Sequence, residues 1–125
     1  MAVDVVRVLV VDDQAAYLRA MIAVVEETPG FAVVGEASSG EECLLVAAQV
    51  IPDLVLMDVN LPGIDGVQAA RRLSAVESPP VVLLLSTYDD DAGVQFIAES
   101  GAAAYMTKSA LGPNRLLEFW SAALR

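Results

Sequence analysis

Three carboxylates follow directly on apolar runs of this sequence. Asp12 and Asp13 come after the run at residues 5–11, and Asp58 comes after the four apolar residues 54–57. Burying an unpaired carboxylate at the end of an apolar strand costs free energy. Carboxylates gathered in one place suit a hard divalent cation such as Mg²⁺, which also accepts backbone carbonyl and water ligands. The pattern therefore indicates a cation site beside a carboxylate that can act as a nucleophile.

Two further apolar runs end in a hydroxyl group and an amine. Ser86 and Thr87 close the run that begins at residue 81, and Lys108, the only lysine of the chain, closes the run at residues 102–108. A lysine ammonium makes a point contact with a phosphoryl oxygen, and a serine hydroxyl can donate to one. Each residue alone has a commoner structural explanation, such as a turn, a cap or a solvated charge. Together they are the groups needed to transfer a phosphoryl group onto Asp58.

Short apolar runs alternate with helical patterns along the whole chain. The expected strands are residues 5–11, 31–37, 53–58, 79–87 and 102–108. The expected helices are residues 14–27, 40–50, 65 to 75, 89 to 100 and 113–125. Strict alternation predicts a doubly wound α/β fold, with a five-stranded parallel sheet and helices on both faces. The carboxyl ends of such strands meet at one edge, where open sheets bind ligands.

Local signals mark where the helices begin and end. Ser38 or Ser39 can cap the helix at residues 40–50, and Asp65 can cap the next one. Gly101 is a natural stop for the helix that precedes it, and Pro113 is a natural first residue for the last helix.

Composition narrows the class of protein. The 125 residues are 56% hydrophobic, which predicts one domain, residues 1–125, with a sizeable core. The net charge of −10 predicts that this chain itself binds neither nucleic acid nor anionic membranes. No apolar run approaches the roughly 20 residues of a membrane helix. The single cysteine, Cys43, falls in an apolar helical pattern, so we expect it to be a core residue. A single cysteine cannot form an internal disulfide and suits a reducing compartment, so we expect a cytoplasmic location.

Four stretches resemble one family along the whole chain. They read "VLVVDDQ", "DLVLMDVNLPGIDG", "VVLLLST" and "GAAAYMTKS". They resemble the receiver domain of two-component response regulators. The stretches "FAVVGEASSG" and "STYDDD" are most similar to the LuxR/NarL-type subfamily, whose members carry a helix-turn-helix output domain. The resemblance implies a flavodoxin-like sheet with strand order 2-1-3-4-5.

The resemblance also implies roles for individual residues. Asp58 matches the phosphoacceptor, which takes a phosphoryl group from a sensor histidine kinase. Asp12 and Asp13 match the acidic pair that binds Mg²⁺ together with Asp58, and the backbone carbonyl of Asn60 would complete the metal shell. Lys108 and Ser86 would assist the transfer.

In the same family, a serine and an aromatic residue act as the conformational switch. Ser86 and Tyr105 match those two positions. The resemblance thus implies a phosphoacceptor switch, with only self-phosphorylation and slow autodephosphorylation of its own. It would control an output, transcription through a DNA-binding domain that is not in this chain.

Three positions depart from the family pattern. Ser109 follows Lys108 where many receivers have proline, and a cis peptide before serine would cost about 3–4 kcal/mol, so we expect a trans bond. Thr87 stands where many receivers have alanine or glycine. Thr87 and the next residue, Tyr88, would modulate access of the phosphoryl group and of water.

Three other functions compete with this interpretation. An aspartate-nucleophile phosphatase needs two aspartates flanking one position after the first strand, whereas here Asp58 and Asn60 form that pair on the third strand. A flavodoxin-like cofactor binder needs a glycine- or hydroxyl-rich loop after the first strand, whereas "DDQAAY" is acidic there. A degenerate receiver acting as a constitutive docking module would lack an essential group, and none is missing.

The last expected helix carries more apolar surface than one sheet contact requires. Its apolar residues cover an arc of about 160° at 100° per residue, against the 100° or slightly more that a sheet-packed helix uses. They are Leu116, Leu117, Phe119, Trp120, Ala123 and Leu124. A neighbouring helix could cover the surplus. Otherwise it predicts a contact with a second receiver, as a homodimer, or with an output domain.

Overall fold

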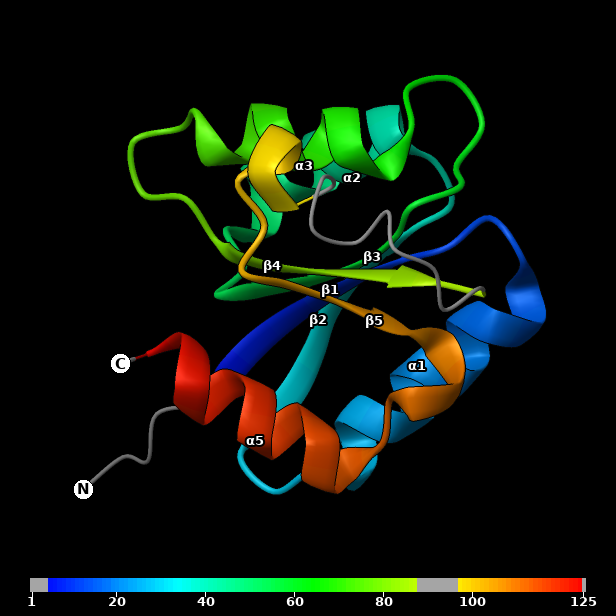
Figure 1. The fold of residues 1–125 in the computed structure, drawn as a ribbon, viewed down its shortest axis with the longest axis vertical. Coiled ribbons are helices and arrows are strands. Elements are labelled where there is room, and N and C mark those ends of the chain that lie inside the picture. The colour runs from blue at the N-terminus through cyan, green and yellow to red at the C-terminus, as the bar shows by residue number, and fades with distance from the viewer. Residues whose placement is uncertain (1–4, 88–96, 125) are drawn as a thin grey trace.

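The computed structural model of the chain describes residues 5–87 and 97–124. Its sheet has five parallel strands in the order β2-β1-β3-β4-β5 (Figure 1). The strands are β1 (Val6–Val11), β2 (Phe31–Ala37), β3 (Leu54–Asp58), β4 (Val81–Ser86) and β5 (Ala104–Thr107). The fold class and the strand order predicted from the sequence are confirmed.

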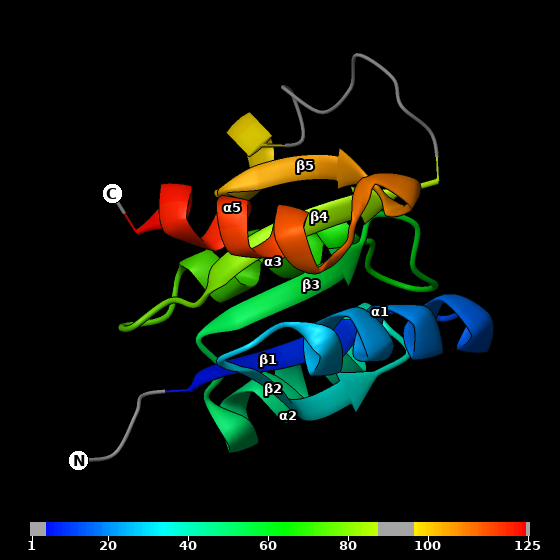
Figure 2. The ribbon, with the colours of Figure 1, turned by 90° about the horizontal axis from the view of Figure 1, so that it is seen from below.

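Helices cover both faces of this sheet. They are α1 (Ala15–Glu27), α2 (Gly40–Val50), α3 (Gly66–Ser74) and α5 (Pro113–Ala123). Helices α2 and α3 pack on one face, and α1 and α5 pack on the other (Figures 1 and 2). Residues 97–100 are helical, while the start of the helix expected from residue 89 lies outside the described residues. A 3₁₀ turn, η1 (Lys108–Ala110), follows β5.

The alternation of side chains along each strand builds two separate cores. In β1, Val8 and Val10 face α1 and α5, whereas Leu9 and Val11 face α2 and α3. Successive strand side chains point to opposite faces, and both faces are covered, so β1, β3 and β4 must be apolar nearly throughout. This explains why these strands read as continuous apolar runs.

The start of α2 is held by a reciprocal pair of hydrogen bonds. The Ser39 hydroxyl accepts from the Glu42 backbone N–H at 3.0 Å, and the Glu42 carboxylate accepts from the Ser38 backbone N–H at 2.6 Å. This resembles a capping box, with the difference that the carboxylate accepts from the residue before the cap. Ser39 is therefore the cap, and Ser38, the other candidate, donates to the partner carboxylate instead.

The other helix signals are placed as expected. The Asp65 carboxylate accepts from the Gln68 backbone N–H at 2.9 Å and caps α3. Pro113 is the first residue of α5. Gly101 has a φ of +76° and follows the helical residues 97–100, so it adopts the left-handed conformation in which glycine commonly ends a helix.

Strands β4 and β5 depart most from the predicted bounds, while β1 and β3 each begin one residue later than predicted. The strand expected over residues 79–87 begins at Val81, because Pro79 and Pro80 have no N–H to donate to a neighbouring strand. The strand expected over residues 102–108 ends at Thr107, because Lys108 begins the turn η1. Lys108 therefore lies just beyond the edge of the sheet.

Helix α5 buries part of its wide apolar arc. Leu116 and Phe119 lie in the core, and the Trp120 ring meets the Phe31 ring edge-to-face with centroids 6.2 Å apart. Leu117 and Leu124 remain 38% and 64% exposed. Phe119 thus faces inward, because α5 turns that side toward the sheet. The outward surplus belongs to Leu117 and Leu124.

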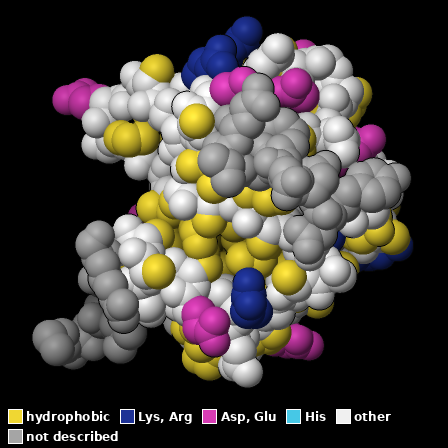
Figure 3. Space-filling view, viewed as in Figure 1, with side chains coloured by type: hydrophobic (Ala, Val, Ile, Leu, Met, Phe, Trp, Pro, Cys, Tyr) yellow, Lys and Arg dark blue, Asp and Glu magenta, His cyan; other side chains and the backbone are white. Residues whose placement is uncertain are grey.

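The burial of Cys43 agrees with the expectation from the sequence. Cys43 is fully buried, and burial raises the pKa of its thiol to about 12, as suits a core residue. Strand β5 is an edge strand with half-buried residues. In the orientation of Figure 1, Figure 3 shows hydrophobic side chains between the two helical layers. Within residues 5–87 and 97–124, the helices are too short or too polar to cross a membrane.

Candidate functional site

Strand order and register bring the polar strand ends together at one edge of the sheet. Val11 pairs with Met57, so Asp12 and Asp58 follow on neighbouring strands. Asp58 pairs with Leu85, and Ser86 pairs with Thr107. Because all the strands are parallel, Asp12, Asp58, Ser86 and Lys108 meet at the carboxyl edge.

Lys108 joins the two buried carboxylates. Its Nζ lies 2.7 Å from Asp12 Oδ2 and 3.6 Å from Asp58 Oδ1. The Lys108 side chain is 7% exposed, and the Asp12 side chain is fully buried. Water therefore screens these charges weakly, and the ammonium offsets part of the cost of burying two carboxylates.

Backbone groups hold both carboxylates in place. The Gln14 N–H donates to Asp12 Oδ1 at 2.9 Å, and the Asn60 N–H donates to Asp58 Oδ1 at 3.2 Å. The second Asp12 oxygen, Oδ2, is buried. Within the described part of the chain it receives no hydrogen bond of good geometry, although the ammonium lies close to it. That oxygen has lone-pair capacity left for a cation.

Asp13 completes an acidic cluster. One carboxylate oxygen each from Asp12, Asp13 and Asp58 lies within 4.8 Å of the others. Asp13 is exposed to solvent, whereas the other two are buried. Three negative groups so close together, one with spare lone-pair capacity, fit a hard cation that prefers oxygen ligands.

The pKa of Asp58 records this environment. It rises from 3.8 to about 6, first because the carboxylate is buried and second because Asp12 is negative; Asp13 adds a smaller push in the same direction. The Lys108 ammonium and the Asn60 N–H work in the other direction and lower the pKa. The ionised form that a nucleophile needs is thus disfavoured by burial, and a nearby cation would restore it.

The remaining predicted site residues lie around this cluster. Ser86 is buried at the end of β4, and Thr87 is exposed directly after it. Tyr105 is half-buried and packs against the core under α2 and α3. The Lys108–Ser109 peptide bond is trans, as expected. Tyr88 lies outside the described residues.

Gly66 supports the site and was not singled out by the sequence. A Cβ at this position would clash with the Asp58 carbonyl oxygen and lie 2.9 Å from Val59 Cα. The Gly66 N–H also donates to the Val59 carbonyl at 2.9 Å. Its sequence signals were its place directly after the Asp65 cap and its position as the last residue of the stretch "DLVLMDVNLPGIDG". The close approach to Asp58 depends on the path of the loop between β3 and α3, which brings Gly66 back to the end of β3.

Tyr17 is the second residue that sequence reasoning missed. Its ring centroid lies 3.9 Å from Lys108 Nζ, so the ammonium sits over the ring face. The only sequence signal was an aromatic residue in the first turn of the helix after the acidic pair. A contact with a side chain 91 positions away has no local pattern.

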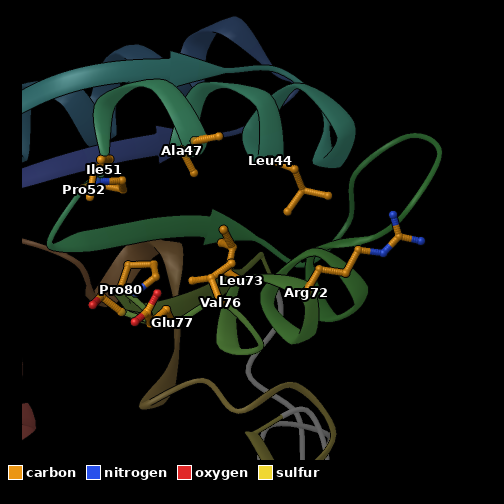
Figure 4. Close-up of a pocket in the computed structure, with 11 residues that line it drawn as sticks. Leu44, Ala47, Ile51, Pro52, Arg72, Leu73, Val76, Glu77 and Pro80 are labelled. Atoms are coloured by element: carbon orange, nitrogen blue, oxygen red, sulfur yellow. The ribbon is translucent and has the colours of Figure 1, made fainter.

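A cavity of about 510 Å³ lies elsewhere, between the carboxyl-terminal ends of α2 and α3. Leu44 and Ala47 of α2 line one side and Leu73 of α3 and Val76 line the other (Figure 4). Residues before β3 and β4 line its base, so the cavity lies toward the amino ends of these strands. Asp12, Asp13 and Asp58 do not line it. Cavity and acidic cluster are separate features.

Known bacterial regulators are similar to this chain in sequence. The response regulator GacA of Pseudomonas aeruginosa is 38% identical over 105 residues, 84% of this chain and 49% of that protein. The transcriptional regulatory protein LiaR of Bacillus subtilis is 35% identical over 104 residues, 83% of this chain and 49% of that protein. The chain spans about half the length of these curated relatives.

A solved structure of the same kind superimposes over almost the whole length. The signal receiver domain of the response regulator NarL from Mycobacterium tuberculosis matches with a TM-score of 0.86 and 29% identity, covering 98% of both chains. The family description "Response regulator receiver domain" matches residues 8–120. Relatives of LuxR/NarL type are thus among its matches, and the chain belongs to the family of response regulator receiver domains.

Proposed function

We propose that this receiver accepts a phosphoryl group on Asp58 from a sensor histidine kinase, in a reaction that depends on Mg²⁺. The observation that carries the proposal is the buried Asp58 carboxylate, 3.6 Å from the Lys108 ammonium and within 4.8 Å of the Asp12 and Asp13 oxygens. A purely structural carboxylate would gain nothing from two negative neighbours that raise its pKa.

The chain's own groups suit in-line transfer. An Asp58 carboxylate oxygen attacks phosphorus, the bond from phosphorus to the kinase's histidine nitrogen breaks, and its electron pair stays on that nitrogen. The Lys108 ammonium lies close enough to Asp58 to contact an oxygen of the arriving group and stabilise its charge. The three aspartate side chains and the backbone carbonyl of Asn60 would hold Mg²⁺. When bound, the ion supplies positive charge to the phosphoryl oxygens.

Ser86 and Tyr105 would transmit the modification. Ser86 ends β4 one residue after Leu85, the strand partner of Asp58 on β3, and Tyr105 of β5 pairs with Leu84 of β4. A new dianionic group on Asp58 would draw the Ser86 hydroxyl toward it, and Tyr105 would move further inward. This is a two-state element biased by local charge. Thr87 and Tyr88, next along the chain, would modulate access of the phosphoryl group and of water.

The output and the partners are inferred from the relatives. Because the chain spans about half of LiaR, a transcriptional regulatory protein, we infer that the receiver controls transcription through a separate DNA-binding domain. The acidic receiver itself would not bind DNA. The exposed Leu117 of α5, and Leu124 directly after this helix, are candidates for a contact with that domain or with a second receiver.

Phosphorylation by a small donor tests the proposal. The chain incubated with acetyl phosphate and Mg²⁺ should gain one phosphoryl group by mass spectrometry, and Asp58→Asn should gain none. Asp13→Ala should impair metal binding, and Lys108→Ala should slow the transfer. Equal labelling of Asp58→Asn, or labelling that persists after all divalent cations are chelated, would contradict the assignment.

A further inference from the structure

The face of the Tyr17 ring covers the Lys108 ammonium. The distance from Nζ to the ring centroid is 3.9 Å, well inside the roughly 6 Å range of a cation–π contact. On another side, the same ammonium lies 2.7 Å from the buried Asp12 carboxylate. The ammonium is thus held between an aromatic face and a carboxylate.

The rest of the lysine side chain lies against α1 as well. A small hollow of about 60 Å³ is lined by Tyr17, Ala20, Met21 and Val24 of α1 together with Lys108 and Leu111. Its lining is mostly apolar, so it suits the methylene groups of lysine better than the charge. Leaving the acidic cluster by this route would place the ammonium in apolar surroundings.

We propose that Tyr17 is a positioning residue for Lys108: its ring face covers the ammonium, keeps it directed at Asp12 and Asp58, and excludes water from that side. The proposal rests on the proposed function, because it assigns the lysine's orientation to a role in phosphoryl transfer. Lysine has four rotatable side-chain bonds and a strongly hydrated head, so its orientation must be supplied by neighbours. The Lys108 side chain is only 7% exposed, and a cation–π contact is stronger when the cation is desolvated.

The ring face, and not the hydroxyl, carries this role. The attraction comes from the quadrupole of the aromatic ring, which phenylalanine shares and leucine lacks. Tyr17→Phe should therefore behave like the parent, and Tyr17→Leu should not. Leucine remains apolar and fits a helix well, so the matched pair separates the ring from simple coverage.

The first experiment observes the contact itself and needs no phosphoryl donor. Lys108 is the only lysine in the sequence, so protein grown with ¹³C-labelled lysine gives one set of lysine resonances. Protons above an aromatic face are shifted upfield. The Lys108 ε-methylene protons should be upfield of free lysine in the parent and in Tyr17→Phe, and should return toward the free value in Tyr17→Leu. A parent resonance at the free-lysine position would overturn the proposal, even if no variant could be prepared.

The second experiment measures what the orientation does. With acetyl phosphate and Mg²⁺, Tyr17→Leu should be phosphorylated about fivefold more slowly, and Tyr17→Phe should stay within about twofold of the parent. The affinity for Mg²⁺, measured by calorimetry, should change by less than about twofold in both variants, because the ring contacts the lysine. Equal rates in all three proteins would overturn the positioning role, as would a loss of Mg²⁺ affinity that matches the loss of rate.

The two failures can be told apart. If the parent itself accepts no phosphoryl group, the proposed function is wrong, and the orientation of Lys108 has no transfer to serve. If the parent is phosphorylated and Tyr17→Leu matches it in rate and in the lysine resonance, only the role of Tyr17 is wrong.

Discussion

The two ends of the sheet bury opposite kinds of side chain. At the carboxyl end, Asp12, Asp58 and Lys108 are buried against one another with charge pairs of 2.7 and 3.6 Å. Toward the amino end, a cavity of about 510 Å³ lies between α2 and α3 and is lined mostly by apolar side chains such as Leu44 and Leu73. Arg72 and Glu77 also line this cavity, but among the described residues its lining contains no group of three carboxylates like that of Asp12, Asp13 and Asp58.

This contrast separates two signals that are often taken together. An apolar cavity leaves packing contacts unmade, whereas buried like charges carry a direct electrostatic cost that must be offset by partners. Asp58 shows that cost as a pKa raised to about 6. In this molecule the proposed site coincides with the buried charges and not with the cavity.

The largest expected effect comes from neutralising the charged end. The folded pKa of Asp58 is raised from 3.8 to about 6, so its ionised form destabilises the fold as the pH rises through that range. At about 1.4 kcal/mol per pKa unit, the full cost above the folded pKa is about 3 kcal/mol. Without divalent cations, Asp58→Asn should therefore gain about 3 kcal/mol over the parent between pH 4 and pH 7.5.

The sign of that effect is specific. Below the unfolded pKa, Asp58 is protonated in both states and the parent pays no penalty, so the gain must appear only as the pH rises. Urea unfolding of both proteins across this range measures it. A difference between the two proteins that is flat with pH would show that ionised Asp58 is not destabilising, and the contrast between the two ends would fail.

A smaller effect should follow from displacing the carboxylate without changing its charge. The three atoms nearest to a Cβ at Gly66 are backbone atoms of Asp58 and Val59, so the end of β3 must shift. Gly66→Ser should lower the free energy of unfolding by about 2 kcal/mol, the usual cost of overpacking, and should also slow phosphorylation. Gly112→Ser is the matched control, because a Cβ there meets nothing within 4 Å and serine suits its helix-cap position. Equal stability of both variants would contradict this account.

The smallest effect is expected at the apolar end. Val76 lines the cavity and is 51% exposed. Val76→Ser should change the free energy of unfolding by no more than about 0.5 kcal/mol, as is usual for exposed positions. Its rate of phosphorylation by acetyl phosphate should equal the parent rate. A clearly slower rate with unchanged stability would show that the cavity and the acidic cluster are coupled. The comparison would then have to explain how a change at one end of the sheet reaches the other.

Much of the fold was predictable from local patterns. Alternating strand and helix signals, with apolar runs such as residues 54–57, predicted the parallel sheet and its covered faces. The Asp65 cap of α3 and the start of α5 at Pro113 were predictable, because helix-start signals involve residues only a few positions apart. The ends of β4 and β5 were less accurate. Two prolines delay the start of β4, and the turn at Lys108 ends β5 one residue before the apolar pattern ends.

The sequence by itself determined which chemical groups lie at the strand ends, because a charged residue that follows an apolar run can be recognised without knowing the fold. It did not determine which of them touch. The tertiary structure decided that Lys108 lies nearer to Asp12 than to Asp58 and that Phe119 turns inward. It also decided that the Tyr17 ring contacts Lys108 and that Gly66 approaches the Asp58 backbone. Those contacts join segments that are distant in the chain or loops that must return onto a strand. These contacts are set jointly by strand order, strand register and side-chain packing. None of the three can be read from the spacing of nearby residues in the sequence.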